Sequence, residues 1–422
     1  MPEAVNLTGK IENQLPAELI TFMQTAGEVA AGQGQSLYLV GGAVRDLLLG
    51  RSNLDFDLVV EGDAIRLAQR LADITHGKII THPRFNTATL RWNKWSIDLI
   101  TARSETYDRP GALPKVKPGA LSSDLFRRDF TINSMAIELV SGRYGQLIDP
   151  YGGRDDLEHN FLRILHERSF VDDSTRIWRG LRYEQRLNFR LEDDTLRLLR
   201  RDIPMLDTIS GDRIRHELEL ILKEEFPEKV LNRAEELKVL PKLHPALKGD
   251  GWLTEKFGQA RKISSPNLPL PGLYLALLSY HLFKEENEDL ISRLRLPKSL
   301  AQTLRDTNSL KAKLESLADP ELVPSSIYSL LYGYSPTAIT AISIAAYSPV
   351  ARRHIQTFLT RLRYVKPSLT GNDLQKLGIP PGPRMKEILQ RLHEARLDGE
   401  VTNKRGEEDM VKGWVDKQNR DL

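Results

Sequence analysis

The sequence predicts an α+β protein, in which an N-terminal α/β unit with a mixed sheet precedes an elongated all-helical remainder. Three observations support this fold class. Short apolar runs of strand character occur between residues 36 and 100, and they alternate with helical patterns. Strand signals nearly vanish after residue 150. From residue 155 onward almost every segment has helical periodicity, interrupted by prolines and glycines.

The expected elements follow one another in a simple order. Residues 16–34 have the apolar spacing of a helix, and further helices are expected at 43–50 and 64–74. Residues 104–123 hold three prolines and two glycines among charges, which indicates a long loop of the kind that is often functional. From residue 368 we expect a loop, a helix and a second loop. Strands are expected at 37–40, 55–60, 78–82, 87–92 and 95–100.

The composition excludes several classes of protein. With 422 residues, 40% of them hydrophobic and 28% charged, the chain is an ordinary multidomain sequence. The net charge of +3 gives no global argument for a polyanionic partner. The absence of cysteine excludes disulfides, thiolate metal sites and a cysteine nucleophile. We expect a cytoplasmic protein without membrane spans, because no secretory signal or uninterrupted apolar stretch is evident.

A pair of aspartates at the start of an expected strand is the first candidate site. Asp55 and Asp57 alternate with Phe56, so both carboxylates should lie on one face of the strand with Phe56 turned away. Two neighbouring carboxylates repel each other, and a divalent metal removes that repulsion. Two aspartates at this spacing, taken alone, are more often part of a solvated strand or turn.

The order of the surrounding residues favours a functional interpretation. Gly41 and Gly42 open a short helix that ends at Gly50, and a short loop then leads to the aspartates. A glycine turn before a helix offers backbone N–H groups to phosphate. Metal-binding carboxylates beside a phosphate cradle suggest nucleotidyl transfer.

Further charged residues could complete such a site. Asp98 lies on the strand before the long loop and could be a third carboxylate of a two-metal site, or an exposed strand residue. Arg127 and Arg128 lie where the loop meets a helix. Adjacent arginines on one helical turn diverge, so we expect one to face a triphosphate and the other to pair with Asp124 or Asp129. The segment DPYGGRDDL at 149–157 is interpreted as a structural turn before a helix.

A second informative segment is 169–190, SFVDDSTRIWRGLRYEQRLNFR. Asp173 and Arg176 are three residues apart on an expected helix and should share a face. A carboxylate and a guanidinium could read the amino donor and the acceptor that cytosine and adenine both present, without a template. A surface helix with ion pairs is the alternative. Further arginines, which could hold phosphates, follow at Arg179, Arg182 and Arg186.

Taken in order, these motifs resemble the class II tRNA nucleotidyltransferases, or CCA-adding enzymes, and the related bacterial poly(A) polymerases of the polymerase-β superfamily. The matching segments, GGAVRD with DFD, RRDFTIN, DPYGGRDDL and DDSTR, span residues 36–190. The stretch IPPGPRMKEIL with LDGEVTN near the C-terminus also resembles the family's tail. Each motif is modest alone, and several in the same order are specific.

The resemblance implies a polymerase-β-like head at 1–150, a helical neck at 151–225, a helical body at 226–366 and a helical tail at 367–422. It implies transfer of C and A residues from CTP and ATP to the tRNA 3′ end, with the body and tail holding tRNA. The 104–123 loop resembles one associated with switching from C to A addition. The resemblance implies Mg²⁺ binding by Asp55 and Asp57, and nucleotide contact by Gly42, Arg45 and Arg128. It implies base recognition by Asp173 and Arg176, with Arg179 and Arg182 nearby. The residues themselves add Asp98 as a catalytic candidate, and Gly41 and Arg127 as nucleotide-binding candidates.

Some departures bear on the assignment. Asp172 stands where the family's base-recognition motif usually begins with Glu, and Ser134 replaces a common alanine. The poly(A) polymerase run GR[R/K]F is not matched, since residues 82–87 read HPRFNT, and this favours tRNA over poly(A) synthesis. Addition of A only, addition of CC only, poly(A) synthesis and an inactive RNA-binding relative remain alternatives. The long loop argues against CC-only addition. The oligomeric state is not indicated.

Overall fold

A computed structural model of the chain describes residues 5–51 and 56–420. These residues form two compact units. The first contains the described residues up to Leu218 together with 237–242, and the second contains 219–236 and the described residues from Leu243 onward. The finer division into head, neck, body and tail remains a prediction. Within the described ranges, no helix is long and apolar enough to cross a membrane.

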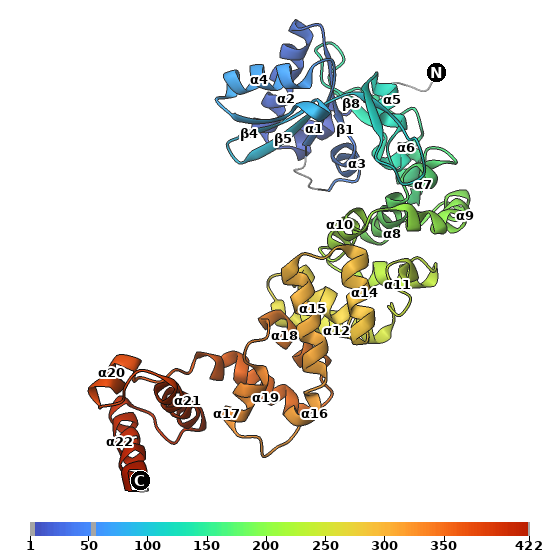
Figure 1. Ribbon diagram of the computed structural model, residues 1–422. Coiled ribbons are helices and arrows are strands. Elements are labelled where there is room, and N and C mark those ends of the chain that lie inside the picture. Colours follow the sequence, from blue (N-terminus) through green and yellow to red (C-terminus); the bar gives the residue numbers. More distant parts are fainter. Residues whose placement is uncertain (1–4, 52–55, 421–422) are drawn as a thin grey trace. The chain divides into compact units, whose positions relative to one another are not determined.

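A seven-stranded mixed sheet lies in the first unit (Figure 1). Its strand order is β3-β4-β5-β2-β1-β8-β9; β2 and β5 run parallel, and the other neighbours run antiparallel. The five expected strands are confirmed, whereas the short β8 and β9 were not expected. The strands are β1 (Ser36–Val40), β2 (Phe56–Glu61), β3 (Lys78–His82), β4 (Thr87–Trp92), β5 (Trp95–Thr101), β8 (Ala136–Glu138) and β9 (Leu147–Ile148).

Helices pack against this sheet because each presents an apolar stripe. In α4, buried Leu67, Ala68 and Leu71 recur at helical spacing, and Asp63 caps the helix by accepting the N–H of Arg66 at 3.0 Å. The short helix α5 places Leu121 and Leu125 against the sheet face that carries Tyr38, Val40 and Val59. The helices around the sheet are α1 (Thr8–Gln14), α2 (Ala17–Gly32), α3 (Gly42–Leu48), α4 (Ala64–Thr75) and α5 (Leu121–Phe126), with a 3₁₀ turn η1 at Pro83–Phe85.

The expectation of a continuous loop at 104–123 is wrong. Strands β6 (Arg103–Thr106) and β7 (Lys115–Pro118) pair as an antiparallel hairpin, and only residues 107–114 connect them. Pro118 is tolerated because it ends its strand, where a missing N–H costs little. The same segment therefore presents side chains in a fixed register, and α5 begins directly after it.

Helices follow the sheet, as expected. The turn at 149–153 is structural, since the Asp149 carboxylate accepts the N–H groups of Gly153 and Arg154 at 2.8 and 2.9 Å and so begins α6. The elements are η2 (Thr131–Asn133), α6 (Gly153–Glu158), β10 (Phe161–Leu162), α7 (Ser169–Asp172), α8 (Thr175–Leu187), β11 (Arg190–Leu191), α9 (Asp193–Asp202), η3 (Ile203–Thr208), α10 (Gly211–Ile221) and η4 (Leu240–Lys242).

The second unit is helical throughout its described residues. Two of the prolines near the predicted breaks, Pro227 and Pro271, are the first residues of helices, because the first helical position needs no N–H donor. Two of three tail helices were not expected, although Thr370 and Asp373 form a capping box that begins α20. The helices are α11 (Pro227–Glu236), α12 (Gly251–Ser264), α13 (Pro271–Leu278), α14 (Lys284–Leu294), α15 (Lys298–Lys311), α16 (Leu314–Leu317), α17 (Pro324–Leu331), α18 (Pro336–Ala345), α19 (Pro349–Thr360), η5 (Leu362–Tyr364), α20 (Gly371–Lys376), α21 (Pro383–Asp398) and α22 (Lys404–Arg420).

The packing of α2 gives a test of the fold. A methyl group built on Gly27 would overlap the backbone carbonyl of Leu139, whereas one built on Gly32 of the same helix would meet open space. We expect Gly27→Ala to lower the free energy of unfolding by about 1–3 kcal/mol through overpacking. Gly32→Ala should stabilise by up to about 1 kcal/mol, as is usual in helices. Urea unfolding of both variants tests this, and a stable G27A variant would contradict the packing of α2.

Candidate active site

Two carboxylates lie next to each other on parallel strands of the sheet. Asp57 on β2 is the register partner of Asp98 on β5, so both side chains project from the same face. The hydroxyl of Thr89 donates to Oδ1 of Asp98 at 2.6 Å. Phe56 is buried and Asp57 is half-buried, which confirms the expected alternation at these two residues. Asp55 lies outside the described residues.

This face of the sheet is the one on which α5 packs. Asp57 and Val59 are two residues apart on β2 and therefore share a face, and Val59 contacts the apolar cluster around Leu121 and Leu125. Carboxylate oxygens are the ligands that Mg²⁺ prefers, so the donor set of Asp57 and Asp98 fits a divalent cation. Among the residues that the structure describes, no group of three or more side chains could hold a metal ion. The metal roles of Asp55, Asp57 and Asp98 remain predictions.

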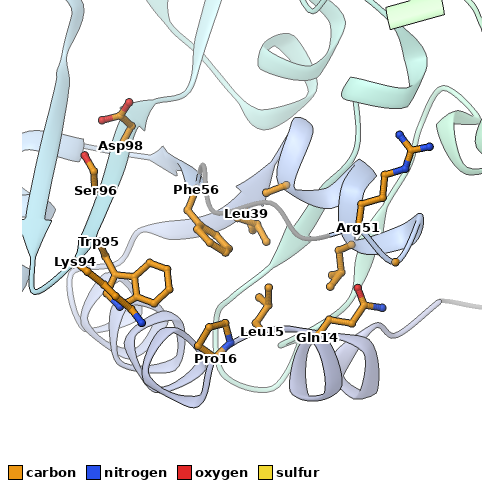
Figure 2. A pocket seen from close by; sticks show the side chains of 13 residues that line it. Gln14, Leu15, Pro16, Leu39, Arg51, Phe56, Lys94, Trp95, Ser96 and Asp98 are labelled. Carbon is orange, nitrogen blue, oxygen red and sulfur yellow. The ribbon is translucent and has the colours of Figure 1, made fainter. Parts of the chain in front are cut away.

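A cavity of about 940 Å³ has Asp98 among its lining residues, together with Phe56 and Trp95. Figure 2 shows Phe56 directed toward Trp95, while Asp98 points away from it. Trp95 is fixed by a hydrogen bond from its Nε1 to Glu18 at 2.9 Å, and Lys94 lies over its ring at 5.0 Å. The carboxylate of Asp98 and the aromatic side chains of Phe56 and Trp95 therefore line one cavity.

The glycine pair forms the sharp turn that the sequence predicts. Gly41 has φ of +70°, which favours glycine, and Gly42 begins α3. A methyl group at Gly41 would lie 2.7 Å from Nη1 of Arg128, so this guanidinium lies directly against the turn. Leu39, two residues before Gly41, pairs with Leu58, next to Asp57. The turn, Arg128 and the sheet carboxylate are thus brought together.

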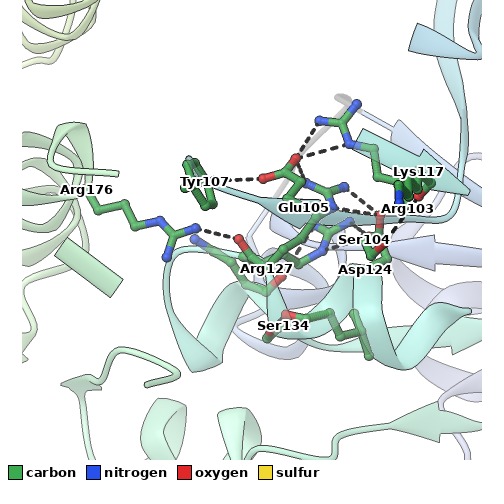
Figure 3. A network of polar contacts seen from close by, with 12 residues as sticks. Arg103, Ser104, Glu105, Tyr107, Lys117, Asp124, Arg127, Ser134 and Arg176 are labelled. Atoms are coloured by element: carbon green, nitrogen blue, oxygen red, sulfur yellow. Dashed lines mark hydrogen bonds and ion pairs between the residues drawn. The ribbon is translucent and has the colours of Figure 1, made fainter. Parts of the chain in front are cut away.

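Arg127 and Arg128 do not diverge as expected, because both bind the same buried carboxylate. Arg127 donates to Oδ1 of Asp124 from Nε and Nη2 at 3.0 and 2.5 Å, and Arg128 donates to Oδ2 at 3.3 and 2.9 Å. Figure 3 shows this network. Burial alone would raise the pKa of Asp124, but the two guanidiniums outweigh it and lower the net pKa below its usual value.

The hairpin joins the same network. Glu105 on β6 accepts Nη1 of Arg127 at 3.2 Å, Nε of Arg103 at 3.1 Å and the hydroxyl of Tyr107 at 2.8 Å (Figure 3). Burial raises the pKa of Tyr107, and the Glu105 carboxylate raises it further. The hairpin is therefore fixed to the start of the RRDFTIN motif through a charged side chain. The sequence gave no indication that Glu105 of the hairpin would bind Arg127.

Arg45 is buried and does not face solvent, where a ligand would reach it. It is 3% exposed, and its guanidinium binds both carboxylate oxygens of Asp46 at 2.8 and 2.9 Å and the Asn133 side chain at 2.7 Å. The Tyr183 ring lies 5.3 Å away. The side chain therefore ties α3 to the RRDFTIN segment, and its direct contact with a nucleotide stays a prediction.

Asp173 does not lie within a helix. Helix α7 ends at Asp172, Asp173 has extended dihedral angles, and α8 begins at Thr175. The spacing argument for one shared helix face therefore fails at this residue. Oδ1 of Asp173 accepts the N–H and hydroxyl of Thr175 at 3.0 and 2.7 Å and Nη2 of Arg213 at 2.7 Å. Arg213 was not singled out from the sequence.

Arg176 is 5% exposed and connects two distant segments. Nη1 donates to Oγ of Ser169 at 2.6 Å, and Nη2 donates to the backbone carbonyl of Arg127, also at 2.6 Å (Figure 3). The expected base-recognition arginine is therefore held on the segment that carries the expected triphosphate arginines. Asp173 and Arg176 are joined by a backbone hydrogen bond, in which the N–H of Arg176 donates to the carbonyl of Asp173 at 3.1 Å.

The next arginines of α8 form a buried cluster with acidic and aromatic partners. Arg179 donates to Oδ2 of Asp129 from Nε and Nη2 at 2.8 and 2.6 Å, and Arg182 lies 4.0 Å from Glu217. The Tyr183 ring lies 5.7 and 4.9 Å from the two guanidiniums. The Asp129 carboxylate raises the pKa of Arg179. The sequence did not indicate Glu217 or Tyr183 as members of this group.

Comparisons with known proteins show the family. A model described as the poly A polymerase head domain matches residues 37–163, and one described as a probable RNA and SrmB-binding site of polymerase A matches 188–250. The A-adding tRNA nucleotidyltransferase of Halalkalibacterium halodurans is 32% identical over 94% of this chain and 93% of its own length. The chain belongs to the tRNA nucleotidyltransferase family.

Two further comparisons agree. The A-adding tRNA nucleotidyltransferase of Geobacter sulfurreducens is 35% identical over 95% of this chain, which spans 47% of that relative's length. The structure of the Thermotoga maritima CCA-adding enzyme complexed with tRNA covers 98% of this chain and 100% of that chain, with a TM-score of 0.78 and 29% identity. The predicted fold class and family are therefore confirmed, while nucleotide specificity is not decided by these names.

The buried pair of Arg179 and Asp129 makes a prediction about acid stability. Burial alone would raise the pKa of Asp129, but Arg179 and Asn133 lower it to about 2, from a usual value of 3.8. A depressed pKa stabilises the folded protein above pH 4, and this contribution is lost as the pH falls toward 2. Between pH 5 and pH 2, Asp129→Asn should lose about 2 kcal/mol less of its unfolding free energy than the wild type.

The measurement is urea unfolding at several pH values. Asp207→Asn is the control, because Asp207 is exposed and forms a surface pair with Lys242. An Asp129→Asn variant whose stability falls with pH as steeply as that of the wild type would contradict the assigned pair.

Proposed function

We propose that the protein transfers AMP from ATP to the 3′ end of tRNA without a nucleic-acid template. The pairing of Asp57 with Asp98, on the sheet face next to Gly41 and Arg128, carries this proposal. Membership of the tRNA nucleotidyltransferase family supports the reaction class, and two relatives of 32% and 35% identity named A-adding support ATP as the donor. The reaction fits the cytoplasmic location expected from the sequence.

In the proposed reaction the terminal 3′ oxygen of the RNA forms a bond to the α-phosphorus of ATP, and the bond to the pyrophosphate oxygen breaks. The hydroxyl proton goes to solvent or to a carboxylate. Asp57 and Asp98, with Asp55, would hold Mg²⁺, which would supply charge neutralisation at the attacking and leaving oxygens. Arg128, fixed against Gly41 by Asp124, would bind triphosphate oxygens, so that catalysis rests mainly on positioning and charge.

For base selection we propose Asp173 together with Arg176. Arg176 is held by Ser169 and by the carbonyl of Arg127, which places its guanidinium between the base-recognition segment and the arginine pair. Arg213 and Thr175 fix Oδ1 of Asp173, and no described hydrogen bond uses Oδ2. That oxygen could accept the exocyclic amino group of adenine or cytosine, but uracil and guanine present another pattern. Arg179 and Arg182 would keep this side of the base site, the wall formed by Asp173 and Arg176, rigid.

Full CCA addition from CTP and ATP is the second candidate. It was the expectation from the sequence, and the full-length match to a structure named as a CCA-adding enzyme favours it. The ordered hairpin at 103–118 is present in the segment that resembles the loop linked to A addition. CC-only addition, poly(A) synthesis and an inactive RNA-binding role have less support.

The test uses three tRNA transcripts that end before CCA, after C and after CC, each supplied with Mg²⁺ and with CTP, ATP or both. We expect extension of the CC-ended transcript by one A and no extension of the other two. Completion of all three would establish the CCA-adding candidate. Extension of an unstructured RNA primer instead would point to poly(A) synthesis. No extension of any RNA would contradict the enzymatic proposal.

A substitution at the sheet tests the role of the carboxylates. Asp57→Asn should lower the rate of AMP transfer by at least about 1,000-fold, because a carboxylate that neutralises transition-state charge would be lost. The affinity for tRNA, measured by filter binding, should stay within about two-fold of wild type. Asp194→Asn serves as the control, since Asp194 is exposed and pairs with Arg197 on α9. Equal losses of tRNA binding and of transfer in D57N would undo the assignment.

A further inference from the structure

The first unit contains a further cavity, of about 790 Å³, which is within the usual size range of ligand pockets. It is lined from β6, from α5 and from the segment 166–176, and the carboxylates Asp57 and Asp98 are not among its lining residues. Its distinctive feature is an exposed aromatic side chain. Phe126, the last residue of α5, is 46% exposed, whereas most large apolar side chains of this unit are buried.

Phe126 is stacked on one neighbouring ring and lies close to a second, tilted ring. The His166 ring lies 4.9 Å from it with an interplanar angle of 30°, and the Tyr151 ring lies 6.0 Å away at 44°. Both neighbours also line the cavity. Burial lowers the pKa of His166, so its ring packs as a neutral aromatic near neutral pH. A partly exposed stack of this kind is a platform on which one more flat ring can be placed.

The charges around the cavity restrict what that ring can carry. The lining includes three arginines and three acids: Arg127, Arg168, Arg176, Glu105, Glu167 and Asp172. Two of the arginines are already occupied, Arg127 by Asp124 and Glu105, and Arg176 by Ser169 and a backbone carbonyl. A nucleoside triphosphate carries about four negative charges near neutral pH and would meet a lining of no net charge. A single nucleobase of an RNA strand is uncharged and does not require a positively charged lining.

We propose that this cavity binds one unpaired base of the RNA 3′ end, stacked on Phe126. The inference deepens the proposed function, since it rests on RNA as the acceptor. Single-stranded RNA is recognised by stacking of splayed bases on aromatic side chains, with hydrogen bonds to their edges. The hydroxyls of Ser122 and Ser123 and the carboxylate of Asp172 line the cavity and supply such partners. Arg127 and Arg176 join this cavity to the proposed catalytic residues, so a base held here would help to position the strand.

The experiment measures base stacking without turnover. The full chain is titrated, with no ATP present, into tRNA transcripts ending in CC in which one of the two terminal bases is replaced by the fluorescent base 2-aminopurine. Wild type and Phe126→Trp should quench at least one of the two probes. Phe126→Ala and Phe126→Leu should lose that quenching and bind tRNA about five-fold or more weakly. Phe283→Ala is the matched control, because Phe283 is 71% exposed in the second unit.

The outcomes separate this inference from the proposed function. Phe126-dependent quenching together with no AMP transfer would leave the base site standing and remove the enzyme. AMP transfer with the same quenching and affinity in wild type, F126A and F126L would overturn the base site alone. Release of the probe from wild type by excess ATP would also overturn it, since the cavity would then be a nucleotide site.

Discussion

The first unit depends on a buried carboxylate held between two guanidiniums. Asp124 is fully buried, and a carboxylate in that position is strongly disfavoured unless its charge is compensated. Arg127 and Arg128 supply the compensation, and each is then fixed in one conformation. Arg128 is thereby placed against the glycine turn, and Arg127 is turned toward the hairpin. The interaction defines the relative placement of α5, the turn before α3 and β6.

Further arginines extend this arrangement into the helices that follow the sheet. Arg176 binds the backbone of Arg127, and Arg179 binds Asp129, so α8 is attached to the RRDFTIN segment at two points. Arg45 attaches α3 to the same segment through Asn133. Because each attachment is a charged hydrogen bond with little exposure, removal of one partner would leave a buried charge without compensation. The residues of the motifs therefore form one connected network.

Much of the fold could be predicted from the sequence, because alternation and helical spacing are local. The five long strands follow from alternation, and the structural turn at 149–153 follows from its glycines and aspartate. The hairpin was not predicted because its strands hold prolines and charged residues. These segments form strands through the pairing of residues 103–106 with 115–118, which are not neighbours in sequence. The break at Asp173 was missed because no proline or glycine marks it. There, the carboxylate of Asp173 itself caps the following helix.

The site residues were harder to predict than the strands, since the direction of a long side chain depends on partners far away in sequence. Local spacing suggests that Arg127 and Arg128 diverge, but burial of Asp124 between them makes them converge. Arg45 was expected at a ligand, and the structure shows its guanidinium bound to Asp46 and Asn133, which the sequence did not indicate. In each case the sequence drew attention to the residue, but it did not indicate the atoms that the side chain binds.

Fixed arginine side chains affect how such a site would discriminate between nucleotides. Charged groups that are already fixed by buried partners do not reorganise when a substrate binds, so their field acts at once on developing charge. Arg176 and Arg179 are fixed in this way, whereas Asp173 keeps one oxygen outside the described hydrogen bonds. Selection of a base by this segment would therefore rest on a rigid wall and one open acceptor. A rigid wall admits only bases whose edge offers a donor at that position, and this restricts the choice without a template.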